Sequence, residues 1–290
     1  MNTHELELKT AYWDDPAARN AFKEFMMSIH GLDFSVWESA GFWDDAYTPF
    51  SYFHNGDVIA SVCMYMLDAV IDGRPSKVTQ ISGVGTLPQF RRQGLNRRLT
   101  DIGLEWIEGK QVGVFLFADA PAIPFYEKCG FEALPDYAEC IEVESTVSRG
   151  GAVKLDLDRP SHIDLIFDVA QRRAPISRKF GILNPKLVMF HALYLLRDFA
   201  FQIPELDCVI FCKRDGERLQ IFDILSEEIP PFEQLYPYIC DVHDRRVEFY
   251  FHTDQLELKS VRIKVLEGNN CYVLPPFPMK NVVFPFTCKA

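Results

Sequence analysis

A change of pattern in the first half of the chain constrains the fold most. The stretch TQISGVGT, residues 79–86, is typical of a strand. The next stretch, LNRRLTDIGLEWI, has its apolar residues at helical spacing. After it comes VGVFLFA, a continuous apolar run that is typical of a strand buried on both faces. Strand, helix and buried strand in this order predict a parallel βαβ unit.

The segments around this unit predict antiparallel pairing. Residues 16–31 form a predicted helix with one apolar stripe and a glycine cap. Asn-Gly at 55–56, between alternating apolar runs, predicts a hairpin, and Asp-Gly at 72–73 predicts a second turn. After the unit, IPFYEKC predicts a short helix that ends at Gly130, and GFEAL predicts another strand.

The composition changes at residues 148–161, where SRGGAVKLDLDRPS indicates a linker. We therefore expect two domains, residues 1–150 and residues 151–290. The second half has two helical segments, a hairpin that turns at 215–216 and further strands. The predicted fold class is α/β (α+β), with a mostly antiparallel sheet around a central parallel βαβ unit, plus a second, smaller α/β domain. The second hairpin is similar to the first, which favours a degenerate repeat without a glycine-rich loop.

Charge and cysteine usage narrow the function classes. The 290 residues carry a formal net charge of −11, which argues against general nucleic-acid binding. The acidic N-terminus predicts no signal peptide, and no apolar run predicts a membrane span. The eight cysteines are scattered through apolar segments without a CxxC motif, which favours free thiols in a cytoplasmic protein and no metal site.

The stretch TLPQFRRQGLNRRL, residues 86–99, gathers four arginines in this acidic chain. It lies where the predicted strand leads into the predicted helix, and a helix start offers free N–H groups and partial positive charge to an anion. Gly94 allows close approach of the backbone, and Arg91 and Arg92 add charge. The alternative is a solvated surface, although positive charge at a helix start opposes the helix dipole. This stretch alone leaves both readings open.

A second segment favours the anion-binding interpretation of this stretch. FLFADAPAIPFYEKCGF follows the helix, and together with GVGTLPQFRRQGLNRRL it resembles the two central motifs of the GNAT superfamily of acyl-CoA-dependent N-acyltransferases. The first segment is similar to the family's R/Q-x-x-G-x-G/A pyrophosphate loop and the strand end before it. The second is similar to the family's N-x-x-A-x-x-x-Y-e-k-x-G-F segment. The resemblance covers about residues 5–147 and is strongest over residues 80–134.

The resemblance implies a role for each matching position. The end of the strand would pair with the pantetheine arm of acetyl-CoA, the backbone after Arg91 would bind the pyrophosphate, and Tyr126 would protonate the leaving thiolate. A backbone N–H near Val84 would polarise the thioester carbonyl. The implied cofactor-binding residues are Val84, Gly85, Thr86, Arg91, Arg92, Gln93, Gly94, Leu95, Asn96, Arg97 and Asp119.

Two positions depart from the family pattern, and the general base is not evident. Asn96 stands where the family prefers Gly or Ala, and Asp119 replaces the usual Asn. The strand before the loop offers Gln80 and Ser82, neither of which is a base, where many relatives use Glu. The base candidates elsewhere are Glu38, Asp44, Asp45, His30 and His54. Some multi-domain relatives, the Eis-type acetyltransferases, use their terminal carboxylate, which would be that of Ala290.

The aromatic residues between 34 and 53 have two interpretations. They favour core and loop packing, but Trp and Tyr also suit an amine through cation–π contacts. Trp37, Trp43 and Tyr47 are therefore candidate acceptor-binding residues. In the family such pockets are built by the first helices and their loop, and a second domain closes the acceptor site in some relatives.

The function expected from these observations is acetyl transfer from acetyl-CoA to a primary amine of a small molecule or peptide, by direct attack. The expected partners are that amine acceptor and no nucleic acid or membrane, and a homodimer is left open. The alternative is a non-catalytic acyl-CoA-binding sensor or scaffold module, which the missing strand carboxylate favours and Tyr126 opposes.

Overall fold

The computed structural model describes residues 6–264 and 270–289, and the chain in it divides into two compact units. Unit 1 comprises residues 1–67, 77–133 and 272–277, and unit 2 comprises residues 68–76, 134–271 and 278–290. The described residues form two β-sheets, and each unit has its own hydrophobic core. The boundaries interleave along the chain, because short segments return to a unit that the chain has already left. The functional division at residue 150 stays a prediction.

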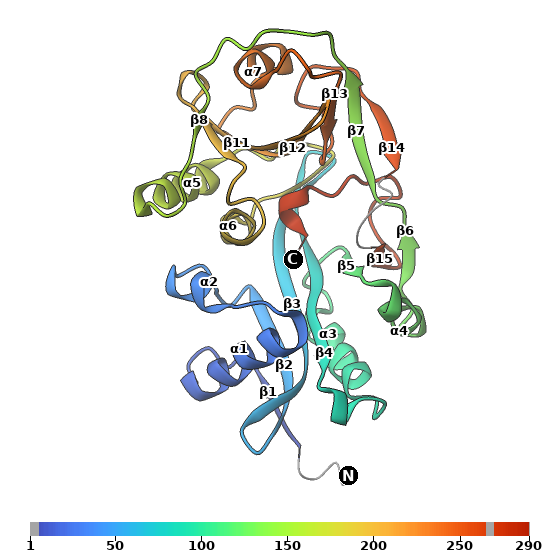
Figure 1. Ribbon diagram of the computed structural model, residues 1–290. Helices are drawn as coiled ribbons and strands as arrows, with labels where there is room; N and C mark the ends of the chain where they lie inside the picture. Colours follow the sequence, from blue (N-terminus) through green and yellow to red (C-terminus); the bar gives the residue numbers. More distant parts are fainter. Residues whose placement is uncertain (1–5, 265–269, 290) are drawn as a thin grey trace. The chain divides into compact units, whose positions relative to one another are not determined.

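The first sheet has the strand order β1-β2-β3-β4-β5-β15-β6 (Figure 1). Its strands are β1 (Glu7–Thr10), β2 (Tyr47–His54), β3 (Asp57–Ile71), β4 (Arg74–Thr86), β5 (Val114–Ala118), β6 (Glu132–Leu134), β9 (Phe180–Ile182) and β15 (Asn270–Leu274). The strand β9 pairs with β3. The β2–β3 hairpin turns at Asn55 and Gly56, both at positive φ, as predicted from the Asn-Gly pair.

The helices of unit 1 are α1 (Pro16–His30), α2 (Ser35–Ser39), α3 (Leu95–Ile107) and α4 (Ile123–Lys128). The Asp15 carboxylate caps α1 by accepting from the Ala18 N–H at 3.0 Å, and Gly31 ends it at φ 64°. The apolar face of α3, with Leu95, Leu99 and Ile107, lies in the same core as Leu116 of β5. The predicted βαβ unit is confirmed, because β4 and β5 pair in parallel across α3.

The second sheet has the strand order β14-β7-β13-β12-β11-β10-β8. Its strands are β7 (Tyr137–Glu142), β8 (Val153–Lys154), β10 (Ala200–Ile203), β11 (Cys208–Asp215), β12 (Arg218–Leu225), β13 (Arg246–Phe249) and β14 (Val261–Lys264). The helices are α5 (Pro160–Arg172), α6 (Pro185–Tyr194) and α7 (Phe232–Ile239). The predicted hairpin is present as β11 and β12, and β12 pairs in parallel with β13 across α7. The mixed α/β class with mostly antiparallel sheets is therefore confirmed.

Three details differ from the sequence prediction. Unit 2 is not the smaller one, because residues 134–271 alone outnumber residues 1–67 and 77–133 together. The predicted linker contains β8, which pairs with β10. The strand β15, which local sequence assigned to the second half, joins the first sheet between β5 and β6. Pairing between strands that are far apart in the sequence depends on the partner strand and not on the local sequence pattern.

Candidate active site

The parallel strands β4 and β5 stop pairing before either strand ends. Their register joins Thr79 to Val114, Gln80 to Phe115 and Ile81 to Leu116. The strand β4 nevertheless continues to Thr86 and β5 to Ala118. On the side facing β5, the backbone of residues 82–86 is therefore not used in this ladder. This segment includes all three residues predicted to pair with a pantetheine arm, Val84, Gly85 and Thr86.

Two glycines shape this end of β4. Gly83 has φ 55°, and a Cβ on it would lie 2.6 Å from Tyr47 Oη and 3.1 Å from Cys63 Sγ. A Cβ on Gly85 would lie 2.7 Å from Ile29 Cγ2. Only glycine fits both positions without displacing a neighbour. Sequence reasoning did not single out Gly83, although the Gly-Val-Gly triplet carries the signal for it.

The loop between β4 and α3 combines left-handed backbone with exposed arginines. Arg92 has φ 62° and Gly94 has φ 73°. Arg91 and Arg92 are exposed, and Arg91 Nε donates to the Thr86 carbonyl at 3.1 Å. Successive amides in such a conformation form a concave site that suits an anion. The segment predicted to bind a pyrophosphate thus has a backbone conformation that suits an anion.

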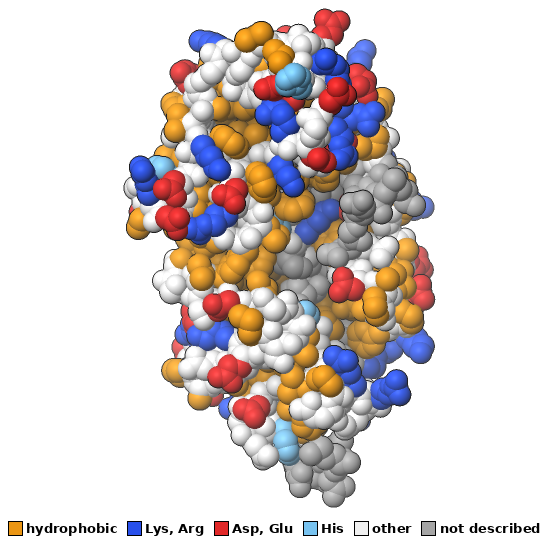
Figure 2. Space-filling view, in the orientation of Figure 1, with side chains coloured by type: hydrophobic (Ala, Val, Ile, Leu, Met, Phe, Trp, Pro, Cys, Tyr) orange, Lys and Arg blue, Asp and Glu red, His pale blue; other side chains and the backbone are white. Residues whose placement is uncertain are grey.

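The helix α3 begins without a side-chain cap. Its ladder starts with the Arg98 N–H, which donates to the Gly94 carbonyl at 3.2 Å, so the amides of the first turn have no partner in the ladder. In contrast, Asp15 caps α1 and Asn184 caps α6. An uncapped helix start with a positive partial charge is an anion-binding geometry. Figure 2 shows Lys and Arg side chains on the surface over α3 and α4.

Asn96 and Arg97 have structural contacts in this loop. The Thr86 hydroxyl donates to Asn96 Oδ1 at 2.8 Å, which joins the end of β4 to the first turn of α3. Arg97 Nε donates to the Asp101 carboxylate at 3.0 Å, and its Nη1 donates to the Lys128 carbonyl at 2.6 Å. The Asn that departs from the family pattern therefore holds the loop in place, and Arg97 connects α3 to the end of α4.

Tyr126 lies on α4 and is 5% exposed, against Phe125 and Phe131. Burial raises the pKa of its hydroxyl well above the usual value, and the nearby Cys129 and Asp119 raise it further. The hydroxyl therefore keeps its proton at neutral pH. Asp119 directly follows β5 and is exposed, so it stands at the same edge of the sheet as the end of β4.

The candidate acceptor-binding aromatics lie in the core of unit 1. Trp37 is 1% exposed, Tyr47 is 3% exposed and Trp43 is 8% exposed. They contact Phe22 and Phe34 in edge-on and stacked arrangements. This is the core packing that the sequence favoured for them. Their role in acceptor binding stays a prediction.

The base candidates occupy different places. Glu38 is paired with both Arg19 and Lys23. Asp44 accepts from the Ala46 N–H, and Asp45 precedes β2 in the same turn. His54 lies at the β2–β3 hairpin against Phe90. His30 is the last residue of α1, next to Ile29, which faces Gly85. Ala290 lies outside the described residues.

The cysteines of the described chain are all free, and seven of the eight are buried. Burial raises the pKa of the Cys208 and Cys212 thiols to about 12, so they stay protonated. Among residues 6–264 and 270–289, no group of three or more metal-ligating side chains is arranged to hold a metal ion. The absence of a metal cofactor stays a prediction.

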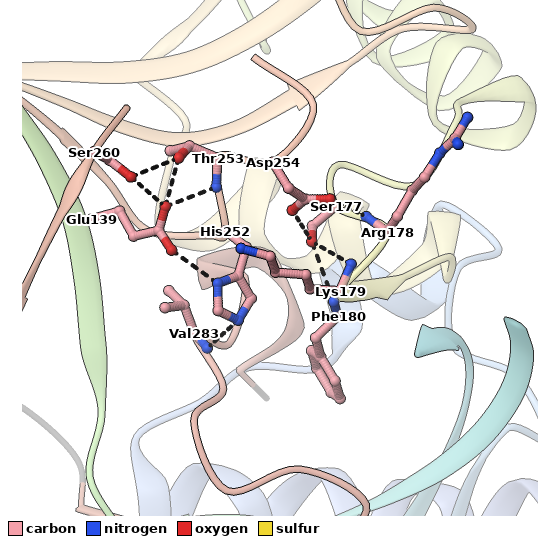
Figure 3. Close-up of polar contacts among 10 residues, drawn as sticks. All are labelled: Glu139, Ser177, Arg178, Lys179, Phe180, His252, Thr253, Asp254, Ser260 and Val283. Atoms are coloured by element: carbon pink, nitrogen blue, oxygen red, sulfur yellow. Dashed lines mark hydrogen bonds and ion pairs between the residues drawn. The ribbon is translucent and has the colours of Figure 1, made fainter. Parts of the chain in front are cut away.

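Unit 2 has a buried polar cluster whose composition is similar to that of a catalytic site. The Glu139 carboxylate accepts from Thr253 N–H at 3.0 Å, from Thr253 Oγ1 at 2.5 Å and from Ser260 Oγ at 2.7 Å, and it lies 2.9 Å from His252 Nδ1 (Figure 3). His252 Nε2 accepts from the Val283 N–H at 3.0 Å. Both ring nitrogens are therefore occupied, and the cluster connects β7 to the segments around residues 253 and 283. It serves the fold of unit 2.

The comparison with protein families agrees with the geometry of unit 1. Residues 7–131 match the model of the acetyltransferase (GNAT) family. This part of the chain is a GNAT domain. The comparison with curated proteins finds no match. This family match supports acyl-CoA-dependent acetyl transfer in general terms.

Solved structures share the fold of the chain beyond the GNAT domain. A GCN5-related N-acetyltransferase from Kribbella flavida is 15% identical, with a TM-score of 0.55 over 94% of this chain and 72% of that one. Eis1 from Mycobacterium abscessus is 14% identical, with a TM-score of 0.57 over 92% and 72%. A putative acetyltransferase from Pyrococcus horikoshii is 12% identical, with a TM-score of 0.52 over 100% and 96%. These similarities concern the fold alone.

None of the helices in the described part of the chain is both long and apolar enough to cross a membrane. The cytoplasmic location stays a prediction.

Proposed function

We propose that the GNAT domain transfers the acetyl group of acetyl-CoA to a primary amine of a small molecule or peptide. One observation carries the proposal: the end of β4 that does not pair with β5 is followed directly by the loop with Arg91 and Arg92 and by the uncapped start of α3. This arrangement offers backbone groups to an extended arm and amides with positive charge to an anion. Acetyl-CoA has both parts and supplies a reactive thioester.

The residues that would hold the acyl donor follow from this placement. Val84, Gly85 and Thr86 would pair with the pantetheine arm. The loop and first turn of α3 would bind the pyrophosphate through amides after Arg91. Asn96 takes part through its backbone, because its side chain is engaged with Thr86. Asp119 stands beside the strand ends and contributes a charge there.

Tyr126 would donate its proton to the leaving sulfur. Its raised pKa keeps the hydroxyl protonated, so a donor is always present at neutral pH. Because this pKa exceeds that of a free thiol, near 8.5, transfer to a thiolate is favourable only while the cationic amine nitrogen resupplies the proton. The phenol then acts as a relay between nitrogen and sulfur.

Isothermal titration with acetyl-CoA tests the donor site. We expect saturable binding, and no binding at millimolar acetyl-CoA would overturn the proposal. A screen of amine acceptors then separates transfer from passive binding. Binding with no acetylated product across a broad amine panel would favour the alternative, a sensor or scaffold module.

Tyr126→Phe tests the acid. We expect kcat to fall about 100-fold, in the range for loss of a general acid, while acetyl-CoA affinity stays unchanged. Tyr272→Phe is the matched control, because Tyr272 is also 5% exposed in the same core. An unchanged kcat for Tyr126→Phe would remove Tyr126 from the mechanism.

A further inference from the structure

The C-terminal end of α1 packs on the end of β4. A Cβ on Gly85 would lie 2.7 Å from Ile29 Cγ2 and 3.1 Å from Phe25 Cζ, so the last turn of this helix touches the strand backbone. Gly31 ends the helix with its N–H donating to the Met27 carbonyl at 2.9 Å. His30 follows Ile29 directly, so its backbone lies at the helix end that packs on this part of β4.

Asp119 reaches the same place from the other strand. It directly follows β5, whose end lies at the same edge of the sheet as the end of β4 because the two strands are parallel. Its charge acts on two groups, the imidazole of His30 and the hydroxyl of Tyr126. One carboxylate thus stands near both a base and an acid, and it occupies the position where the family usually has a neutral Asn.

His30 has the properties of a neutral base. The residue is exposed, yet its neighbours desolvate the ring enough to lower the imidazole pKa below its usual value, and the Asp119 charge opposes this shift. Neither the preceding residues 27–29 of α1 nor residues 84–86 of β4 can ionise. Within the described residues, Asp119 is the charged group that acts on the ring.

Three of the other candidates for a base have contacts elsewhere in the described chain. Glu38 is held between two cations, and Asp44 binds a backbone N–H in the turn before β2. His54 belongs to the hairpin at the opposite end of β2 from this turn. His30 is the candidate whose helix end contacts the part of β4 that does not pair with β5.

We propose that His30 is the general base that removes a proton from the acceptor amine, with the charge of Asp119 acting on its ring. This inference rests on the proposed function. For an acceptor that arrives as an ammonium ion, His30 takes the first proton and releases it to solvent. The nitrogen lone pair then forms the C–N bond to the acetyl carbonyl carbon.

The remaining steps balance without another reactant. The C–S bond breaks with its electron pair on sulfur, and Tyr126 gives its hydroxyl proton to that sulfur. The excess proton on nitrogen replaces the one that Tyr126 has lost. The products are the acetylated amine, free CoA thiol and one proton in solvent.

Kinetics of His30→Ala test the base. We expect kcat/KM for the amine to fall about 100-fold at neutral pH, with acetyl-CoA affinity by titration unchanged. Added imidazole should restore part of the rate, which a structural defect would not allow. His243→Ala, at an exposed histidine of unit 2, is the matched control and should behave as the unaltered protein. An unchanged rate for His30→Ala overturns the inference and leaves the proposed function standing, whereas failure to bind acetyl-CoA overturns both.

NMR titration of the His30 imidazole tests the pairing without any substrate. Because the Asp119 charge raises the pKa of His30, Asp119→Asn should move the midpoint of this titration to lower pH. The acid limb of the kcat/KM profile should move in the same direction. A midpoint that does not respond to Asp119→Asn overturns the role of Asp119.

Discussion

The two parallel βαβ units of the molecule, one in each sheet, share a scaffold and differ in chemistry. In unit 1, β4 and β5 pair across the 13-residue helix α3. In unit 2, β12 and β13 pair across the 8-residue helix α7, with Arg218 opposite Arg246 and Ile221 opposite Phe249. Neither helix has a side-chain cap at its start. In both βαβ segments, a helix N-terminus therefore follows a parallel strand.

The loops that enter the two helices differ in charge and in free N–H groups. The first loop has left-handed Arg92 and Gly94 and carries exposed arginines. The second, SEEIPP at residues 226–231, carries two glutamates and two prolines, and Glu233 adds a negative charge in the first turn. Proline has no N–H to donate, and carboxylates repel an anion. The scaffold alone therefore does not make an anion site.

The second loop is also tied to its neighbours. The Ser226 carbonyl accepts from the Ala174 N–H at 2.8 Å, and Glu227 accepts from Arg172 at 2.6 Å. These contacts hold the second loop within unit 2, whereas the first loop is exposed. A diverged repeat stays a prediction. The following predictions test this contrast, from the largest expected effect to the smallest.

Charge reversal in the first loop should have the largest effect. Arg91→Glu with Arg92→Glu should weaken acetyl-CoA binding about 1000-fold, because each reversal costs roughly 2 kcal/mol near the surface and 1.4 kcal/mol is tenfold. Titration calorimetry at two salt concentrations measures this and should show a weaker salt dependence in the variant. The control is Glu228→Arg in the second loop, which should leave the affinity unchanged. Equal losses in both variants would contradict the contrast.

Loss of the Glu139 carboxylate should destabilise unit 2 by about 2 kcal/mol, because hydrogen bonds to a charged group in the interior are lost. Burial raises the pKa of Glu139, but hydrogen bonds from His252, Thr253 and Ser260 outweigh this and lower it to about 2. The folded pKa is below the unfolded one, so this stability is present above about pH 4.3 and is lost as the pH falls toward 2.

Urea unfolding of Glu139→Gln at pH 7 and at pH 3 measures both effects. The variant should lose stability at pH 7 and show a smaller further loss at pH 3 than the unaltered protein. Glu142→Gln is the control, because Glu142 lies on the same strand with a 71% exposed side chain paired to Arg246. Surface pairs of this kind contribute little, so the control should change stability by under about 1 kcal/mol.

Gly94→Ala should have the smallest effect and separate strain from binding. Gly94 has φ 73° and Gly109 has φ 72°, and a Cβ at either position would meet nothing within 4 Å. Alanine at either site should therefore cost about 1 kcal/mol of stability from backbone strain alone. Only Gly94→Ala should also weaken acetyl-CoA binding, by several-fold. Equal affinities of the two variants would mean that the amides after Gly94 do not contact the donor.

Local sequence patterns predicted the βαβ unit and both hairpins, because each depends on neighbouring residues. Gly31, Asn55 and Gly56 take the positive φ values that their turn types require. The helix α7 was not predicted, because Pro237 in its interior is a helix-breaking signal. It forms nevertheless, with Leu235 and Tyr236 buried in the core of unit 2, so tertiary packing outweighs the local penalty.

The motifs of the candidate site could be predicted from the sequence, but the contacts between segments that are distant in the sequence could not. The residues of the loop and Tyr126 follow from the resemblance of two segments of the chain to the central motifs of the family. The contact between Ile29 and Gly85 joins residues far apart in sequence, and no local period encodes it. His30 therefore could not be distinguished from the other base candidates before the end of α1 was seen against β4.

The strand β15 has a consequence for how this chain is made. The first sheet takes residues 270–274 between β5 and β6, although the family match ends at residue 131. A ribosome must therefore synthesise almost the whole protein before the first sheet is complete. Until then the edge of β5, with Phe115 and Leu116, lacks its partner strand β15. A truncated chain that stops near residue 150 would keep that apolar edge exposed permanently, and we expect it to aggregate during expression.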